Sequence, residues 1–149
     1  MTTLIRHKRA RFDYEILDTF EAGISLFGHE VKSLRNGRAK IEGAYVVVRG
    51  GEAFLVGASI QPYQGANTPK EYDPERPRKL LLSKKEIAEL LAQSEKRGLT
   101  LVPLSVYNSN RFVKVKVGVV KGKKEFDKRD SIQKRETNRN ILRTLKNQK

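Results

Sequence analysis

The sequence predicts a mainly β fold: a small closed antiparallel barrel with two or three short helices and a basic C-terminal tail that is disordered when free. Three observations predict it. Apolar runs pair across tight turns, one segment alone has a strong helical pattern, and the last fifth of the chain is too polar to fold by itself. The chain has 149 residues, of which 38% are hydrophobic, so it suits one domain with a substantial core.

The first strand is expected within residues 12–27. Tyr14, Ile16 and Phe20 recur at even positions among polar neighbours, a pattern typical of a strand with one buried face. Glu21-Ala22-Gly23 indicates a bend or a bulge inside this strand.

Two helices are expected from their start and stop signals. A short helix is expected over Gly28 to Arg35, because Asn36-Gly37 then ends the pattern. The stronger helix begins after Ser83, which forms a capping box with Glu86, and it ends before Gly98. Both helices are short, so the fold stays mainly β.

Two hairpins supply most of the remaining structure. Residues 45–49 and 53–56 flank Gly50-Gly51, a composition that suits a two-residue turn. Residues 99–107 and 112–120 flank an Asn-Ser-Asn turn, and alternate valines of the second run share one face. Hairpins without a βαβ rhythm favour a closed barrel of the OB type, with an SH3-like barrel as the competing geometry.

Charge divides the chain into a barrel domain over residues 1–120 and a tail over residues 121–149. The tail holds eleven Lys and Arg and four Asp and Glu, so it carries +7 of the net charge of +14. It has few large apolar residues to offset the cost of ordering its backbone, about 1–2 kcal/mol per residue. Ile141, Leu142 and Leu145 could form one face of a helix, so we expect the tail to become helical on binding a partner.

The residues suggest no catalytic constellation. The chain has no cysteine, and its two histidines, His7 and His29, lie outside metal-binding motifs. Glu30 could act as a base, but an ion pair with Lys32, Arg35 or another basic residue is the stronger interpretation. We therefore expect no enzyme activity, no cofactor and no metal.

A long surface loop over residues 61–79 holds four of the five prolines. Glu71, Asp73 and Glu75 alternate along it and could hold a cation, which would suit a metal-dependent nuclease. The stronger interpretation is that they are solvated charges that offset neighbouring Lys and Arg residues.

The net charge of +14 favours a polyanionic partner. No segment approaches the roughly 18 apolar residues of a membrane span, and the N-terminus lacks the apolar stretch of a secretory signal. We expect a cytoplasmic protein with no membrane partner. Basic residues gather in four places: Arg6, Lys8, Arg9 and Arg11; Lys32, Arg35, Arg38 and Lys40; Arg78 and Lys79; Lys114 and Lys116.

The aromatic content bears on the type of nucleic acid. Eleven aromatic residues and no tryptophan leave few rings for stacking single-stranded bases, with Tyr63, Tyr107 and Phe112 as the candidates. Recognition of a folded RNA by its shape fits better. A general single-strand binder or a ribosomal protein is the alternative.

Several motifs occur in a consistent order from about Arg6 to the C-terminus. They are Arg9-Ala10-Arg11, Phe20-Glu21-Ala22-Gly23, the run from Gly28 to Arg35, Asp73-Pro74, Arg78-Lys79-Leu80-Leu81-Leu82, the run from Lys114 to Gly118, Lys121-Gly122-Lys123-Lys124 and Asp127-Lys128-Arg129. In this order and spacing they resemble the small protein B family, the SsrA-binding proteins of bacterial trans-translation.

The resemblance implies an OB-type barrel that binds the tRNA-like domain of transfer-messenger RNA, as one monomer per RNA. It further implies delivery of that RNA to a ribosome stalled on an mRNA without a usable stop codon, for ribosome rescue and peptide tagging. In the family the tail becomes helical in the vacant mRNA channel, next to the decoding centre, which implies the same for residues 121–149.

The resemblance also implies two sets of contact residues. The expected contacts to transfer-messenger RNA are Arg9, Arg11, Glu21, Lys32, Arg35, Lys79, Leu81 and Ser83, with Ser83 where the family often has Asn. The expected ribosome contacts lie in the tail: Lys121, Gly122, Lys123, Lys124, Phe126, Asp127, Lys128 and Arg129.

Overall fold

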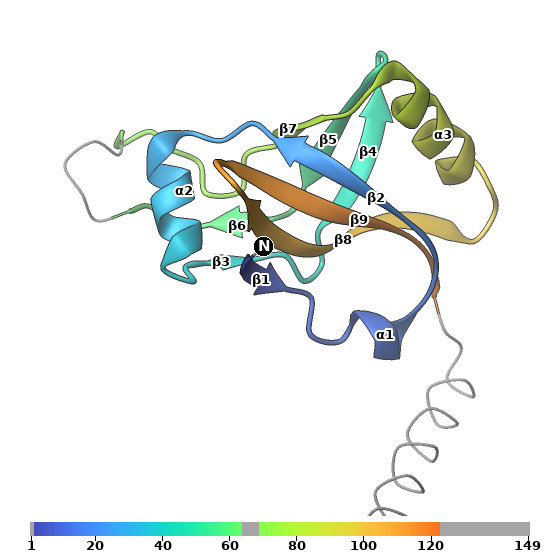
Figure 1. Ribbon diagram of the computed structural model, residues 1–149, viewed down its shortest axis with the longest axis horizontal. Helices are drawn as coiled ribbons and strands as arrows, with labels where there is room; N and C mark the ends of the chain where they lie inside the picture. The colour runs from blue at the N-terminus through green and yellow to red at the C-terminus, as the bar shows by residue number, and fades with distance from the viewer. Residues whose placement is uncertain (1, 64–68, 123–149) are drawn as a thin grey trace, which may run out of the picture.

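The computed structural model describes residues 2–63 and 69–122, and these form a mainly β domain with three helices (Figure 1). The helices are α1 (Ala10–Asp13), α2 (Gly28–Arg35) and α3 (Lys84–Ser94). The strands are β1 (Thr2–Arg6), β2 (Tyr14–Ile24), β3 (Ala39–Lys40), β4 (Tyr45–Arg49), β5 (Glu52–Val56), β6 (Ser59–Ile60), β7 (Arg78–Leu81), β8 (Leu99–Ser109) and β9 (Phe112–Gly122).

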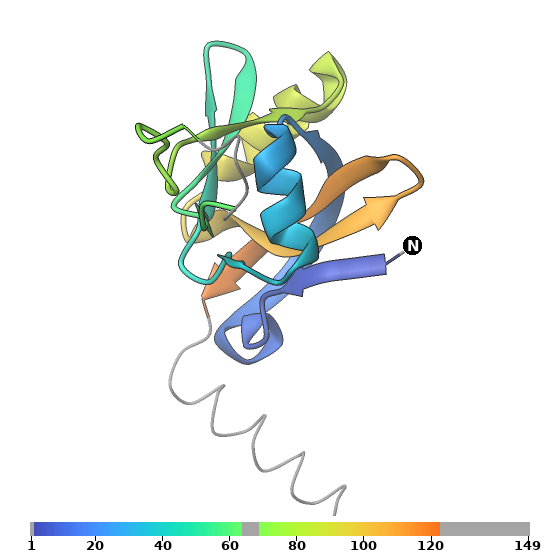
Figure 2. The ribbon, with the colours of Figure 1, turned by 90° about the vertical axis from the view of Figure 1, so that its left-hand side faces the viewer.

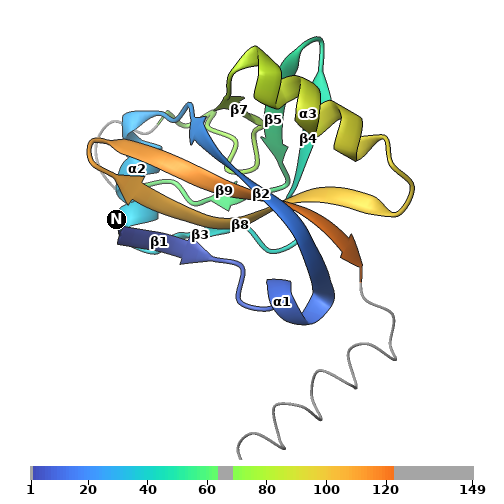
Figure 3. The same cartoon turned by 45° about the vertical axis from the view of Figure 1, so that its right-hand side comes forward.

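Seven strands form one antiparallel sheet in the order β1-β8-β9-β2-β7-β5-β4, and β3 pairs separately with β6. The sheet curls so that β4 packs against β8 (Figure 3). The prediction of a closed barrel is not confirmed, because within residues 2–63 and 69–122 the edge strands β1 and β4 each pair with one neighbour only. The coarser prediction, an antiparallel mainly β fold with short helices, is confirmed.

Both predicted hairpins are present. Gly50 and Gly51 have φ angles of 59° and 75°, the left-handed conformation that a two-residue turn between β4 and β5 requires. The β8–β9 turn is shorter than expected, because Ser109 pairs with Phe112 and leaves a two-residue loop. Asn110 accordingly adopts a φ of 55°, which asparagine tolerates better than most side chains.

The first expected strand is correct in the middle and wrong at its start. Residues 10–13 form α1, and β2 begins only at Tyr14. The bulge expected at Glu21-Ala22-Gly23 lies elsewhere, since the register of β2 against β9 shifts between Ile16 and Asp18. The shift leaves Leu17 half exposed.

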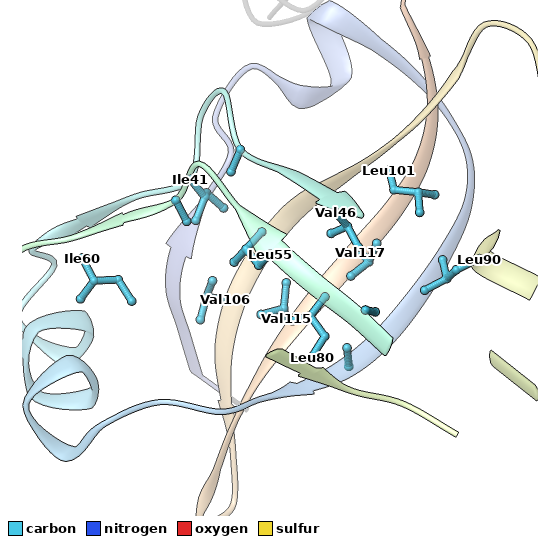
Figure 4. Packing of buried hydrophobic residues seen from close by; sticks show 14 of the residues in the cluster. Ile41, Val46, Leu55, Ile60, Leu80, Leu90, Leu101, Val106, Val115 and Val117 are labelled. Atoms are coloured by element: carbon cyan, nitrogen blue, oxygen red, sulfur yellow. The ribbon is translucent and has the colours of Figure 1, made fainter. Parts of the chain in front are cut away.

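The core fills the inside of the curled sheet (Figure 4). Val115, Val117 and Val119 of β9 are buried, as the alternation predicted, and they pack with residues from β4, β5, β7, β8 and α3. Val120 is buried as well, because Ala10 of α1 covers the opposite face at that end of the strand. The C-terminal part of β9 is therefore buried on both faces.

The helices α2 and α3 lie at opposite ends of the domain, with α2 nearest the viewer in Figure 2. The predicted capping box of α3 is confirmed, since Ser83 Oγ accepts the Glu86 N–H at 3.2 Å. Leu90 anchors α3 to the core and is fully buried. No helix within the described part of the chain is long and apolar enough to cross a membrane.

Candidate nucleic-acid interface

The outer face of β9, β2 and β7 aligns residues from distant parts of the sequence. Glu21 lies opposite Lys116, and Gly23 lies between Lys114 on one side and Leu81 on the other. The neighbours of these residues in sequence, among them Ala22, Leu80 and Val115, point into the core. Because side chains alternate along a strand, Glu21, Lys116 and Leu81 face solvent together.

Leu81 is an apolar residue on this polar face, with 54% of its surface exposed. Its side chain lies over Gly23, where an added Cβ would come within 3.2 Å of Leu81 Cβ. Glycine at position 23 therefore makes the room that Leu81 occupies. The sequence motif contains Gly23, but sequence reasoning did not connect it with Leu81, because the contact depends on the β2–β7 register.

A groove of about 1060 Å³ continues this face toward β1 and α1. The predicted contacts Arg11 and Glu21 both line it. Four basic residues and two carboxylates surround it, so it can accept a polyanion backbone and still offer hydrogen-bond acceptors. The charged lining residues are Arg6, Lys8, Arg11, Lys116, Glu15 and Glu21.

Two buried side chains form part of the groove wall. His7 is 8% exposed, and its Nδ1 has no hydrogen-bond partner among the described residues. Tyr107 is 6% exposed. Burial, and after it the nearby Glu21 carboxylate, raise the pKa of the Tyr107 hydroxyl. Tyr107 thus belongs to the wall of the groove rather than to an open stacking platform.

The other expected RNA contacts are spread over the surface. Arg9 precedes α1, and its guanidinium lies 4.8 Å from the centre of the Phe12 ring. Lys32 and Arg35 are exposed on α2, and neither lines the groove. The structure therefore brings Arg11, Glu21 and Leu81 onto one continuous face, but it does not bring Lys32 and Arg35 to it.

Lys79 and Ser83 have partners within the protein. Lys79 Nζ forms a 2.9 Å salt bridge with Glu52, and both side chains are half exposed. Ser83 Oγ is engaged with Glu86 at the start of α3, 2.9 Å from its Oε1. An RNA ligand would have to compete with Glu86 for the Ser83 hydroxyl.

Arg78 is not a phosphate-binding residue, contrary to its place among the predicted basic clusters. It is fully buried, and its Nε and Nη2 donate to Glu30 Oε2 at 2.9 and 2.7 Å. Arg76 donates to the other carboxylate oxygen of Glu30. The interpretation of Glu30 as an ion-pair partner is confirmed, but its partners are Arg76 and Arg78 and not the two named candidates Lys32 and Arg35.

The Glu30 network fastens the segment before β7 to α2. The Phe27 N–H donates to Glu30 Oε1 at 2.8 Å, and the Tyr72 hydroxyl lies 2.9 Å from Oε2. Burial opposes ionisation of Glu30, but the hydrogen bonds from Arg76, Phe27 and Arg78 outweigh it and hold its pKa below the ordinary value of 4.5. Burial and the Glu30 carboxylate raise the pKa of Tyr72 to about 12.

The carboxylates considered for a cation site do not converge. In the part of the chain that the structure describes, no group of three or more His, Asp or Glu side chains is arranged to hold a metal ion. Asp73 Oδ1 instead accepts the Glu75 N–H at 2.9 Å, a turn within the loop.

The predicted ribosome contacts are mostly outside the described residues. Lys121 and Gly122 are the last residues of β9, opposite Glu15 and Tyr14 of β2. The end of β9 therefore lies beside the start of β2, which directly follows α1 (Figure 3). Lys123, Lys124, Phe126, Asp127, Lys128 and Arg129 lie outside the described residues.

Comparison with known proteins shows which family the chain belongs to. The family model described as "SmpB protein" matches residues 4–147, nearly the whole chain. The chain belongs to the SmpB protein family. The resemblance drawn from the ordered motifs is thereby confirmed.

Relatives within the SmpB family are similar along almost their full length. The SsrA-binding protein of Enterococcus faecalis is 46% identical over 144 residues, which cover 97% of this chain and 93% of that protein. The SsrA-binding protein of Gloeothece citriformis is 47% identical over 140 residues, 94% of this chain and 90% of the relative. A solved chain described as "tmRNA-SmpB: a journey to the center of the bacterial ribosome" has a TM-score of 0.69 and 47% identity, covering 81% of this chain and 85% of that one.

Proposed function

We propose that this protein binds the tRNA-like domain of transfer-messenger RNA and delivers it to stalled ribosomes in trans-translation. The observation that carries the proposal is the alignment of Glu21, Lys116, Lys114 and Leu81 on one outer face of a chain that belongs to the SmpB family. The names of its relatives, SsrA-binding proteins, support the same partner.

The residues of this face have complementary roles in the proposal. Lys114, Lys116, Arg6 and Arg11 bind phosphates, which sets affinity and position. The Glu21 carboxylate accepts hydrogen bonds from base edges or from ordered neighbouring cations, and Lys116 opposite it limits its repulsion of phosphate. Leu81 supplies an apolar contact to an exposed base or ribose.

The proposal divides the chain at the end of β9. The folded domain binds the RNA as an OB-type barrel, closed by side-chain packing of β4 on β8, and the packing of these two strands supports this assignment. The basic tail engages the decoding centre and the vacant mRNA channel and becomes helical there. The protein acts as a monomeric cytoplasmic adaptor without catalysis of its own.

Removal of residues 123–149 tests this division while it leaves β9 whole. We expect the truncated protein to keep its affinity for the tRNA-like domain within about threefold at physiological salt, because the proposed RNA face is intact. Peptide tagging on ribosomes stalled at the end of an mRNA should be abolished. Tagging at the full-length rate would refute the role of the tail, and equal affinity of the full chain for an unstructured RNA would favour a general single-strand binder.

Replacement of Gly23 by Ala tests the contact between β2 and β7. The new methyl group forces Leu81 to move by a few tenths of an ångström, because the available distance is 3.2 Å. We expect the affinity for the tRNA-like domain to fall about fivefold, measured by gel shift or calorimetry. Gly28→Ala is the matched control, since a Cβ at Gly28 would meet nothing within 4 Å.

A further inference from the structure

A second hollow lies between the start of α2 and the segment before β7, at the end of the domain that faces the viewer in Figure 2. It encloses about 470 Å³. None of its residues lines the groove described above. We call it the aromatic box, and its lining residues are Phe27, His29, Pro69, Glu71, Tyr72, Asp73 and Arg76.

Three rings form the walls of the aromatic box. The ring centres of His29 and Tyr72 are 4.7 Å apart with the rings nearly perpendicular, and those of Phe27 and His29 are 5.5 Å apart. Phe27 has 51% of its surface exposed although it is a large apolar residue. Phe27 therefore keeps part of its ring open to the hollow, although the Arg76 guanidinium already lies over it.

The walls are held in place by the Glu30 network. The Tyr72 hydroxyl lies 2.9 Å from both Glu30 Oε2 and the Ile60 carbonyl, and Arg78 donates to it at 2.9 Å. The Arg76 guanidinium, paired with Glu30, lies 4.1 Å from the centre of the Phe27 ring. The site is therefore preformed, and a ligand does not have to order the side chains of the aromatic box when it binds.

The polar groups left open at the aromatic box accept hydrogen bonds. Glu71 and Asp73 are exposed and neither takes part in a salt bridge within the described residues, although Asp73 Oδ1 accepts the Glu75 N–H. His29 Nδ1 is buried and has no hydrogen-bond partner among the described residues. In the neutral ring tautomer with the proton on Nε2, this atom is an acceptor.

Charge distinguishes the aromatic box from the rest of the protein. The charges of Arg76 and Arg78 are balanced in part by the buried carboxylate of Glu30, whereas the charges of Glu71 and Asp73 remain at the rim. These carboxylates repel phosphates, so the box is a poor site for RNA even on a chain with a net charge of +14. A cation with a flat surface fits better, because it can stack on the rings and donate to the carboxylates.

We propose that the aromatic box binds an arginine side chain of a partner protein. The guanidinium is planar, always charged and carries five N–H donors, which matches aromatic walls with a rim of acceptors. A lysine ammonium would gain less, because it cannot stack on the rings. This site goes beyond the RNA-binding proposal and does not depend on it.

An NMR titration of the full-length protein with the peptide acetyl-Gly-Arg-Gly-amide tests the proposal. We expect saturable shifts of the His29 and Tyr72 ring signals. The corresponding citrulline peptide has the same shape without the charge and should bind at least about tenfold more weakly. Equal binding of the two peptides, or shifts with adenosine or cytidine monophosphate but not with the arginine peptide, would overturn the proposal.

A double variant at the rim separates this site from the RNA face. Glu71→Gln with Asp73→Asn should weaken arginine-peptide binding about tenfold and leave the affinity for the tRNA-like domain unchanged. The matched control is Glu89→Gln with Glu95→Gln, which removes two exposed carboxylates from the α3 end and should leave peptide binding unchanged. Thermal melts establish that both variants fold, and an unchanged peptide affinity in the rim variant would refute the proposal.

Discussion

Replacement of Glu30 by Gln is expected to lower the free energy of unfolding by about 3–5 kcal/mol, the usual cost of removing one member of a buried ion pair. The loss arises because Arg78 is fully buried and would keep its charge without the carboxylate that its Nε and Nη2 contact. Chemical denaturation monitored by circular dichroism measures the difference. A loss below about 1 kcal/mol would contradict the assigned role of Glu30.

Glu52→Gln is the matched control for this prediction. It removes a carboxylate from the salt bridge with Lys79, in which both side chains are 48% exposed. Water screens that pair and hydrates either partner left alone, so we expect a loss of less than about 1 kcal/mol. The contrast between the two variants isolates the effect of burial from the loss of a negative charge.

The effect of Glu30 depends on pH with a defined sign. Its pKa in the folded protein is lower than its ordinary value of 4.5. Ionised Glu30 therefore contributes its full stabilisation above pH 4.5, and the contribution falls as the pH drops below that value toward the folded-state pKa. We expect the gap in unfolding free energy between wild type and Glu30→Gln to narrow in acid. If the difference in unfolding free energy between wild type and Glu30→Gln instead grew as the pH fell from about 5 to about 3, the assigned direction of the Glu30 pKa shift would be wrong.

Replacement of Leu81 by Asp is expected to reduce the affinity for the tRNA-like domain at least about thirtyfold, which corresponds to about 2 kcal/mol. The substitution exchanges the apolar contact at the centre of the proposed RNA face for a carboxylate that repels phosphate. Since more than half of the Leu81 surface is already exposed, the folded domain should lose little stability. Gel shifts at two salt concentrations, with thermal melts alongside, measure both quantities.

Leu91→Asp controls for the exchange of an exposed leucine for a charge. Leu91 is 41% exposed, lies on α3 and does not belong to the outer face of β9, β2 and β7. We expect the affinity of this variant to stay within about threefold of wild type. An equal loss in the two variants would show that added negative charge anywhere on the domain weakens binding, and Leu81 would have no special position.

The local elements of the fold were predictable because their signals are local. Gly50-Gly51 indicated a two-residue turn, Ser83 and Glu86 indicated a helix start, and alternate valines indicated the buried face of β9. Each of these depends on residues a few positions apart. Strands β1, β3, β6 and β7 were missed, because they are short or carry no clear alternation, and most of their pairing partners are distant in sequence.

The candidate site was predictable residue by residue but not as an arrangement. The motifs contained Glu21, Gly23 and Leu81, yet only the strand register shows that Gly23 accommodates Leu81. The prediction of a surface loop over residues 61–79 was wrong at its end for the same reason. Arg78 appears in the sequence as one more surface charge, whereas it is buried against Glu30, 48 residues away along the chain.

The position of β9 determines how the domain withstands mechanical load. The strand is 11 residues long and is hydrogen-bonded to β2 on one side and β8 on the other, almost to its last residue. A pull at Gly122 along the strand axis would load both ladders in shear, so many hydrogen bonds would share the force instead of breaking one after another. Under the proposed function, in which the tail binds the ribosome and the outer face binds the RNA, a pull on the tail would act first on a strand that is paired on both sides.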